Sequence, residues 1–402
     1  MKQNGLKSFS GFQKKTLAAC FIVYFCTYIG RLNMSATLGN IISEMNIEET
    51  LGGMLQTLFA VTYAAGQLVF GMLADRFEPK RLIFTGLAGS AACNLLFSLS
   101  GSFYLCMVIW TVNGIFQAMI WTPIVLIMAY AFNDAERKTA SLVMSFTLAG
   151  GHLAAWAIAM GLARALTWRW SYAIPAAILL ATGVFALTFL PIVEKKTVTA
   201  GKFSGGIGSF KALWGTGLVF VLLCCITNGF VRDGVITWAP TILTGNGGGN
   251  ETLFSLLIPC INMLGILLGA YLVRHVKSSI RMITAVMMAA VAVPAFIAFI
   301  GKGLPVYILA LMLGLISAIL YGTNPLLTTL IPMEYDYMGR VGLVAGLTDC
   351  SIYIGSSIAG VATGWMHDMS GSWQIVYLVW TIAAVVGGTL GLFATKKTKE
   401  QA

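Results

Sequence analysis

The sequence predicts an all-α membrane protein with twelve transmembrane helices in two six-helix pseudo-repeats. The 402 residues are 58% hydrophobic and 10% charged, whereas soluble proteins carry about 25% charged residues. Apolar runs between charged residues often reach about 18 residues, which is the length of a membrane-spanning helix. Lysine and arginine fall mostly on alternate loops, as the positive-inside rule predicts.

Apolar runs bounded by charged or turn-forming segments give the helices in order. The first follows the segment "MKQNGLKSFSGFQKK", which is polar for too long to begin a cleavable signal peptide. The first six helices are predicted at 16–38, 53–75, 81–99, 103–131, 139–162 and 170–191. The other six, bounded by segments such as "TGNGGGNET" and "MEYDYMGR", are predicted at 213–241, 252–275, 280–300, 304–331, 340–365 and 373–394.

The longest segment without membrane character separates two halves of the chain. It predicts an N-terminal bundle at 1–191, a cytoplasmic linker at 192–212 and a C-terminal bundle at 213–402. With both termini in the cytoplasm, 20 lysines and arginines lie on inner segments and 3 on outer ones. This split predicts a multi-pass plasma membrane protein, in bacteria of the inner membrane, with cytoplasmic termini.

Two arginines lie inside apolar spans, one on the first helix of each half. Arg31 is midway along its helix, where a charge costs ~2.5–3.5 kcal/mol and usually lines a cavity. Tyr24, Tyr28 and Arg31 are spaced i, i+4 and i+7, so a continuous helix would place them on one face. Matching polar positions in two repeats predict a site between the halves, near mid-membrane. A structural ion pair is the alternative, although no acid lies near Arg31 on this helix.

On the seventh helix, Asn228 lies one turn before Arg232, and Asp233 follows it. Adjacent helical residues point in different directions, so Arg232 and Asp233 need not pair. On the eleventh helix, Asp349 either couples transport to protons or serves a structural ion pair. Two forked guanidinium groups could together neutralise a divalent anion. When the site is empty, two uncompensated cations would oppose movement of the halves, and a bound anion would remove that barrier. This predicts obligatory exchange of one anion for another.

Further polar side chains could contact the rest of a substrate. Interhelical hydrogen bonding, worth ~0.6 kcal/mol on average, explains most of them almost as well, and a lone histidine is often a packing residue. These candidates are Tyr63 and Gln67 on helix 2, Asn113, Gln117 and Trp121 on helix 4, and His152 on helix 5. Tyr321, Asn324 and Pro325 on helix 10 predict a bend rather than a ligand.

The segment "GMLADRFEPKR" (71–81) resembles the loop signature of the major facilitator superfamily, through Gly71, Asp75 and Arg76. Within it, the chain resembles the organophosphate:phosphate antiporters, the group of the glycerol-3-phosphate and hexose phosphate transporters. The matching stretches are "YFCTYIGRLN" (24–33), "GIFQAMIWTP" (114–123) and "VRDGVITWAPTIL" (231–243).

This resemblance implies the major facilitator fold and an exchanger of organophosphate for phosphate by alternating access. It implies that Arg31 and Arg232 bind the phosphate, near tyrosines that match Tyr24, Tyr28 and Tyr63. Gln67 stands where the glycerol-3-phosphate type has a lysine. The family's helix 5 histidine falls near Thr147 or Leu148, and His152 lies about a turn further on.

These patterns leave two other functions open. A proton-coupled symporter of sugar acids or carboxylates is the second reading, and a membrane sensor of sugar phosphates is the third. An enzyme is not expected, since no nucleotide-binding loop occurs and the eight cysteines show no metal-ligand spacing. We expect no cofactor, no metal and no nucleic acid, and a monomer whose partners are a small anion and membrane lipid.

Overall fold

The structure is a computed structural model that describes residues 9–73, 77–192, 217–245, 251–275, 280–331 and 341–399. These residues form helices, turns and short connections without any strand, so the all-α prediction is confirmed. Each of the twelve predicted segments is mainly helical where it is described, although the first is interrupted at residues 30–32. Ten stretches among the described residues are long and apolar enough to span a membrane, and α3 and α15 are the predicted spans outside that set.

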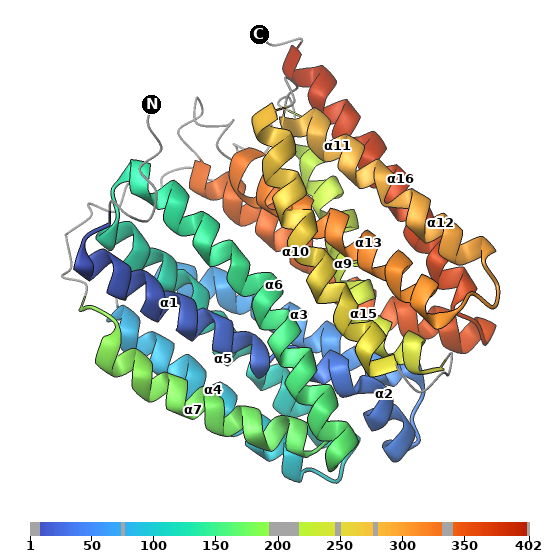
Figure 1. Cartoon of the computed structure of the whole chain (residues 1–402), viewed down its shortest axis with the longest axis horizontal. Helices are drawn as coiled ribbons and strands as arrows, with labels where there is room; N and C mark the ends of the chain where they lie inside the picture. The colour runs from blue at the N-terminus through green and yellow to red at the C-terminus, as the bar shows by residue number, and fades with distance from the viewer. Residues whose placement is uncertain are drawn as a thin grey trace. The chain divides into compact units, whose positions relative to one another are not determined.

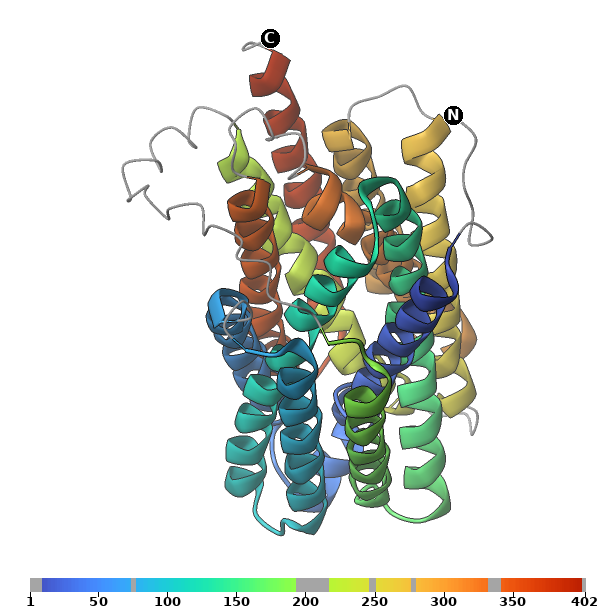
Figure 2. The same ribbon diagram turned by 90° about the vertical axis from the view of Figure 1, so that its left-hand side faces the viewer.

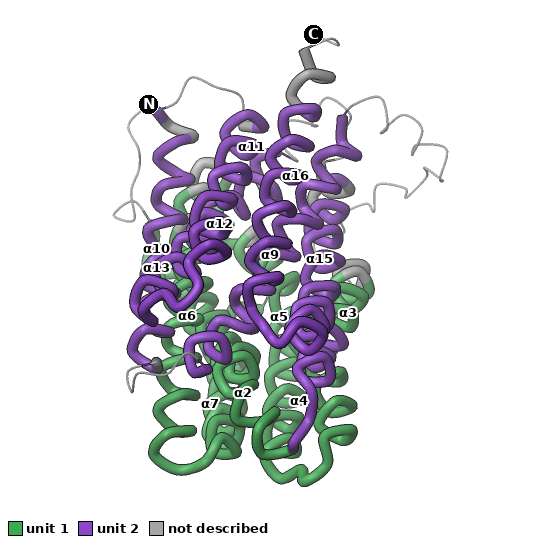
Figure 3. The backbone as a smooth tube through the Cα atoms, turned by 90° about the vertical axis from the view of Figure 1, so that its right-hand side faces the viewer, with its two compact units in different colours: residues 1–45, 61–198 green, residues 46–60, 199–402 purple. Residues whose placement is uncertain are grey.

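The chain divides into two compact units, coloured separately in Figure 3. Unit 1 holds residues 1–45 and 61–198, and unit 2 holds residues 46–60 and 199–402. Helix α3 (Glu49–Leu73) contributes its first part to unit 2 and the remainder to unit 1. Of the linker predicted at 192–212, only Ile192 is among the described residues. The linker therefore stays a prediction.

Unit 1 contains six further helices. They are α1 (Gly11–Ile29), α2 (Asn33–Met45), α4 (Pro79–Leu99), α5 (Phe103–Ala131), α6 (Asp134–Ala165) and α7 (Trp170–Phe189). Helix α4 packs against α5 and α7, and α1 packs against α6 and α7 (Figures 1 and 2). Two of these helices begin with a capping box, in which the first side chain and the side chain three residues later each bind a backbone N–H. The pairs are Ser10 and Gln13 at the start of α1, and Asn133 and Glu136 at the start of α6.

Unit 2 contains the remaining helices. They are α9 (Leu218–Gly245), α10 (Glu251–His275), α11 (Ile280–Ala290), α12 (Ala292–Ile300), α13 (Val306–Pro325), the π-helical turn η3 (Leu326–Leu330), α15 (Val341–Ser370) and α16 (Gln374–Lys399). The span predicted at 280–300 is divided into α11 and α12. The predicted bend on helix 10 coincides with the change from α13 to η3 after Pro325.

Glycines allow the helices of unit 2 to pack closely. A Cβ atom added to Gly229 would lie 1.9 Å from the carbonyl oxygen of Ile352, where α9 meets α15. One added to Gly265 would lie 1.9 Å from the carbonyl oxygen of Ala318, where α10 meets α13. Small residues at such contacts let backbones approach where no hydrophobic effect drives helices together. This packing fixes α9, which carries Arg232.

Candidate functional site

The first predicted span is broken at Arg31. Helix α1 ends at Ile29 and α2 begins at Asn33, with Gly30, Arg31 and Leu32 in non-helical conformations between them. The backbone N–H groups of Arg31 and Leu32 both donate to the carbonyl of Tyr28, at 3.2 and 2.9 Å. The prediction of a continuous helix over 16–38 is therefore wrong. The shared helical face predicted for the two tyrosines and Arg31 does not continue through this break.

Buried amides satisfy the backbone where the helix is interrupted. The Asn94 amide donates to the Gly30 carbonyl at 3.0 Å, and the Asn113 amide donates to it at 3.3 Å. Asn33 donates to Asn94 Oδ1 at 2.8 Å and to the Ser171 carbonyl at 3.0 Å. Broken helices are tolerated in membranes where neighbouring side chains satisfy the freed groups. Sequence reasoning missed Asn94, although an asparagine within an apolar run is a usable signal.

The structure brings two predicted residues of unit 1, Tyr63 and Gln67, together near Arg31. The Arg31 guanidinium lies over the Tyr63 ring, 4.4 Å from its centroid, which is cation–π geometry. Gln67 donates to the Tyr63 hydroxyl at 2.7 Å, and Thr122 donates to Gln67 Oε1 at 3.1 Å. This network holds the tyrosine ring under the cation.

The other aromatic candidates form an adjoining cluster in unit 1. The ring centroids of Tyr24 and Tyr28 are 5.2 Å apart, and those of Tyr24 and Trp121 are 4.5 Å apart. The Tyr28 ring lies against Gly151, next to His152. His152 is fully buried, with its ring edge-on to Trp156 at 4.3 Å. This position is compatible with a packing role for His152 and also with a role in substrate binding.

Gln117 is turned into the bundle of unit 1. It is 1% exposed, and its amide donates to Ser90 Oγ at 2.8 Å and to the Thr27 carbonyl at 3.4 Å. Ser90 in turn donates to Asn113 Oδ1 at 2.6 Å. These contacts join α5 to α4 and α1, so Gln117 and Asn113 support the broken helix.

In unit 2, Arg232 is paired with the residue that follows it. Its Nε donates to Asp233 Oδ1 at 2.7 Å, and its Nη2 donates to Asp233 Oδ2 at 3.0 Å. Its Nη1 donates to Asn324 Oδ1 of α13 at 2.6 Å. The spacing left open whether Arg232 and Asp233 pair, and they do: the side chains turn toward each other although their Cβ atoms point in different directions. Asn324, interpreted as part of a bend, is a direct partner of Arg232.

Asn228 reaches the same part of α13. Its amide donates to Thr323 Oγ1 at 2.7 Å and contacts Met288 Sδ at 3.6 Å. Helix α9 thus presents Asn228 and Arg232 to neighbouring residues at the end of α13. This agrees with the predicted spacing of one helical turn between them.

For the remaining candidates, the structure gives fewer contacts with the two arginines. Asp349 is half-buried on α15 and interacts electrostatically with Cys225 of α9, as Arg232 also does. Gly71 lies near the end of α3, and Asp75 and Arg76 lie outside the described residues.

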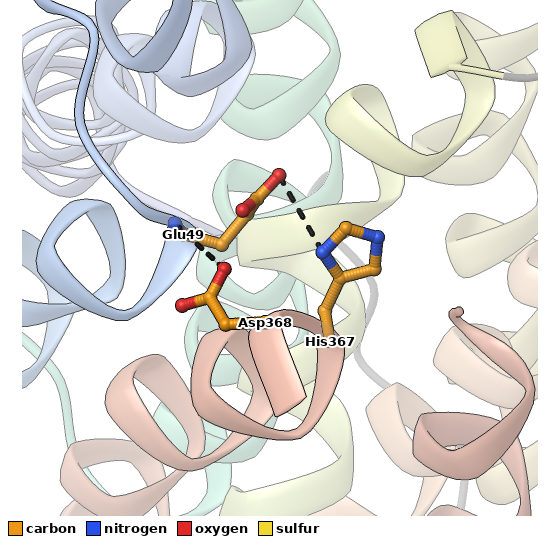
Figure 4. A group of neighbouring side chains, drawn as sticks. All are labelled: Glu49, His367 and Asp368. Carbon is orange, nitrogen blue, oxygen red and sulfur yellow. Dashed lines mark hydrogen bonds and ion pairs between the residues drawn. The ribbon is translucent and has the colours of Figure 1, made fainter. Parts of the chain in front are cut away.

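A second polar cluster joins the start of α3 to the end of α15 within unit 2 (Figure 4). Glu49, His367 and Asp368 offer ligand atoms that all lie within 4.8 Å of one another. Asp368 accepts hydrogen bonds from the backbone N–H groups of Glu49 at 3.2 Å and Thr50 at 2.7 Å, and from the Thr50 hydroxyl. It therefore caps α3 from another helix, a role usually filled by the residue preceding a helix.

The charges of this cluster depend on one another. His367 Nδ1 lies 3.5 Å from Glu49 Oε1, and the His367 ring stacks on Trp373. Burial, followed by a hydrogen bond with Asp368, raises the pKa of Glu49. Burial also acts to raise the pKa of Asp368, but hydrogen bonds with Glu49 and Thr50 outweigh it and lower the pKa. Sequence reasoning missed this cluster because its members are more than 300 residues apart.

These arrangements suit anion recognition. A guanidinium offers planar pairs of N–H donors that match the oxygens of phosphate or carboxylate, and it stays charged at working pH. Unit 1 presents one such group over an aromatic ring, and unit 2 presents another beside a carboxylate.

Comparison with known proteins agrees with this fold. The family model of the Major Facilitator Superfamily matches residues 20–350. The chain is 24% identical to "Putative glycerol-3-phosphate transporter 2" of Arabidopsis thaliana, over 97% of this chain and 88% of that protein. It is 26% identical to the "Glycerol-3-phosphate transporter" of Bacillus subtilis, over 56% of each chain.

Among solved structures, the crystal structure of the nucleoside transporter NupG matches with a TM-score of 0.74. It is 14% identical and covers 96% of this chain and 100% of that one. Identity this low supports the fold alone. The family match spans most of the sequence and agrees with the helical units described above. The chain therefore belongs to the Major Facilitator Superfamily: it is a multi-pass membrane transporter and not an enzyme.

Proposed function

We propose that this transporter carries a small organic anion by alternating access, and that the anion is an organophosphate exchanged for phosphate. The relatives named as glycerol-3-phosphate transporters support the substrate class. The observation that carries the proposal is Arg31, a cation held over the Tyr63 ring at a break in an apolar span.

The environment of Arg31 gives the physical basis. A charge within a span usually faces a cavity or a partner rather than lipid. At the break, neighbouring amides of α4 and α5 hold the Gly30 carbonyl, which fixes the backbone immediately before Arg31. A guanidinium whose backbone is fixed loses less conformational entropy on binding than a flexible one. Arg31 is therefore the principal anion ligand of unit 1, and Arg232 is its counterpart in unit 2.

The charge of unit 2 differs from what the sequence suggested, although exchange remains part of the proposal. The sequence suggested two cations that only a bound anion could neutralise. Asp233 already compensates Arg232, so reorientation without substrate is opposed less at unit 2 than that argument assumed. Support for exchange comes mainly from the resemblance to the antiporters.

The second candidate is a proton-coupled symporter of sugar acids or other carboxylates. Asp349 on α15 is the observation that favours it, because carboxylates within spans often carry protons. We further propose that the protein is a monomer of the plasma membrane, a bacterial inner membrane, with cytoplasmic termini. The distribution of lysine and arginine supports this orientation.

Binding to the purified full chain tests the substrate class. Inorganic phosphate, glycerol-3-phosphate and a sugar acid are compared by calorimetry for the wild type, Arg31→Gln and the control Arg164→Gln, which changes an exposed residue in the last turn of α6. A hydrogen bond to a charged group is worth ~1.5–3 kcal/mol. Arg31→Gln should therefore raise the Kd for organophosphate by ~10- to 100-fold, and Arg164→Gln should not.

Transport in proteoliposomes then separates the mechanisms. Exchange predicts that uptake of labelled glycerol-3-phosphate needs phosphate inside the vesicle. Uptake of a sugar acid driven by a pH gradient, with no internal anion, would favour the symporter. Equal organophosphate affinity in the wild type and Arg31→Gln would remove Arg31 from the site.

A further inference from the structure

The carboxylate of Asp233 occupies one edge of the Arg232 guanidinium. Both of its oxygens accept hydrogen bonds from that edge, at 2.7 and 3.0 Å, and Asn324 accepts from Nη1 at 2.6 Å. This is the bidentate geometry that a substrate carboxylate or phosphate would adopt on an arginine. Asp233 thus already makes the contacts that a transported anion would make.

The pair is held in place rather than placed at a mobile surface. Both side chains are 12% exposed. Two glycines on either side of the pair let other helices pack closely against α9, which restricts movement of its backbone. A Cβ atom at Gly229 would lie 1.9 Å from the Ile352 carbonyl oxygen, and one at Gly234 would lie 3.1 Å from Trp380 Nε1. The carboxylate therefore remains within reach of the guanidinium while α9 keeps its packing.

The surroundings of the pair contain other ionisable groups. Asp233 cancels the unit charge of Arg232, and nearby groups modulate the local potential. Tyr321 on α13 and Tyr353 on α15 interact electrostatically with Arg232. Cys225 on α9 interacts with Arg232, with Cys224 and with Asp349 on α15.

We propose that Asp233 is an internal counter-anion of Arg232 and sets which charge state of the substrate is preferred. This inference rests on the proposed function, in which Arg232 contacts the transported anion. An arriving oxyanion either displaces Asp233 from the guanidinium or binds beside it. In both cases the carboxylate stays close to the bound anion, because Asp233 follows Arg232 directly on α9, and it repels each added negative charge on the substrate. Each added charge therefore gains less than it would at an unpaired arginine.

The charge state of the substrate can be varied without changing its shape. A phosphate monoester loses its second proton near a pKa of about 6, so it is mainly a monoanion at about pH 5 and mainly a dianion at about pH 7.5. The Kd for glycerol-3-phosphate is measured at both pH values on the purified full chain. The ratio of the two Kd values reports the preference for the dianion.

Asp233→Asn keeps the shape of the side chain and removes its charge. The ratio should shift toward the dianion by at least ~10-fold in this variant, since one unit charge at contact distance has an effect of this order even at a high effective dielectric constant. Glu48→Gln is the matched control, because it removes an exposed carboxylate outside the pair, and its ratio should equal that of the wild type.

A second variant covers the case in which Asp233→Asn fails to fold with Arg232 uncompensated. Asn324→Asp adds a carboxylate at the Nη1 side of the same guanidinium, so it should weaken dianion binding by ~10-fold, opposite in sign. If Asp233→Asn folds and its Kd ratio matches the wild type, the inference is overturned while the proposed function stands; if it does not fold, an unchanged ratio in Asn324→Asp has that consequence. If the wild type itself binds neither glycerol-3-phosphate nor phosphate at either pH, both proposals fail.

Discussion

Replacement of Asn94 by leucine tests whether the break in the first span positions Arg31. Asn94 contacts both sides of the break, because it donates to the Gly30 carbonyl at 3.0 Å and accepts from Asn33 at 2.8 Å. Leucine has a similar size and suits an apolar helix, but it makes neither bond. The Gly30 carbonyl then keeps only the longer bond from Asn113, at 3.3 Å.

The expected cost follows from these bonds. Interhelical hydrogen bonds in membrane proteins average ~0.6 kcal/mol each, and a buried group left without its partner adds ~1–3 kcal/mol. Asn94→Leu should therefore destabilise the protein by about 2 kcal/mol. If the break positions the guanidinium, the Kd for organophosphate should also rise by ~10-fold, since one charge-assisted hydrogen bond is worth ~1.5–3 kcal/mol.

Thermal unfolding in detergent and calorimetric binding are measured on the same samples. Asn262→Leu is the matched control, because Asn262 is fully buried on α10 and its amide has no hydrogen-bond partner among the described residues. Removing an unsatisfied amide should raise the unfolding temperature. A lower unfolding temperature for Asn94→Leu with unchanged affinity would refute a positioning role for the break.

Three further predictions address other contacts. Tyr63→Ala should weaken organophosphate binding by about 1 kcal/mol through loss of the cation–π contact with Arg31, whereas Tyr63→Phe should retain most of the affinity in the same titration. Asp368→Ala should lower the unfolding temperature at neutral pH, because a helix cap is worth about 1 kcal/mol. The folded state lowers the pKa of Asp368, so the stability that its carboxylate contributes is lost as the pH falls through that lowered pKa. The difference in unfolding temperature between wild type and Asp368→Ala should therefore shrink below pH 3.8, the ordinary pKa. An equal difference at neutral pH and at this low pH would contradict the prediction. Gly265→Leu should destabilise by more than about 2 kcal/mol in thermal unfolding, since the added Cβ would overlap the Ala318 carbonyl, and a wild-type melting curve would argue against the close helix contact.

The helices were predictable because lipid imposes one rule on every span. A membrane-crossing segment has to satisfy its backbone internally and present apolar side chains, so long apolar runs predict helices wherever they occur. All twelve predicted segments are mainly helical for this reason. The span around Arg31 departs from the rule because Asn94 and Asn113 supply hydrogen bonds from other helices, and a hydropathy pattern contains no information about such partners.

The candidate site was predictable in part. Placing an arginine within a membrane span costs free energy, so such a residue usually has a function. Arg31 and Arg232 could therefore be selected from the sequence alone. Their partners could not. Spacing suggested that Arg232 and Asp233 point apart, yet long side chains rotate about several bonds and meet at 2.7 Å. Helical spacing fixes the direction of Cβ and leaves the far end of an arginine undetermined.

The sequence by itself determined the membrane-spanning class, the helical segments and the two arginines within apolar runs, because each follows from local hydrophobicity and charge. Only the tertiary structure decided where the first span is interrupted, that Asp233 and Asn324 share the Arg232 guanidinium, and that Asp368 caps α3 from more than 300 residues away. Each of these depends on which helices lie side by side, and that is set by the packing of small residues and buried amides distant in the chain.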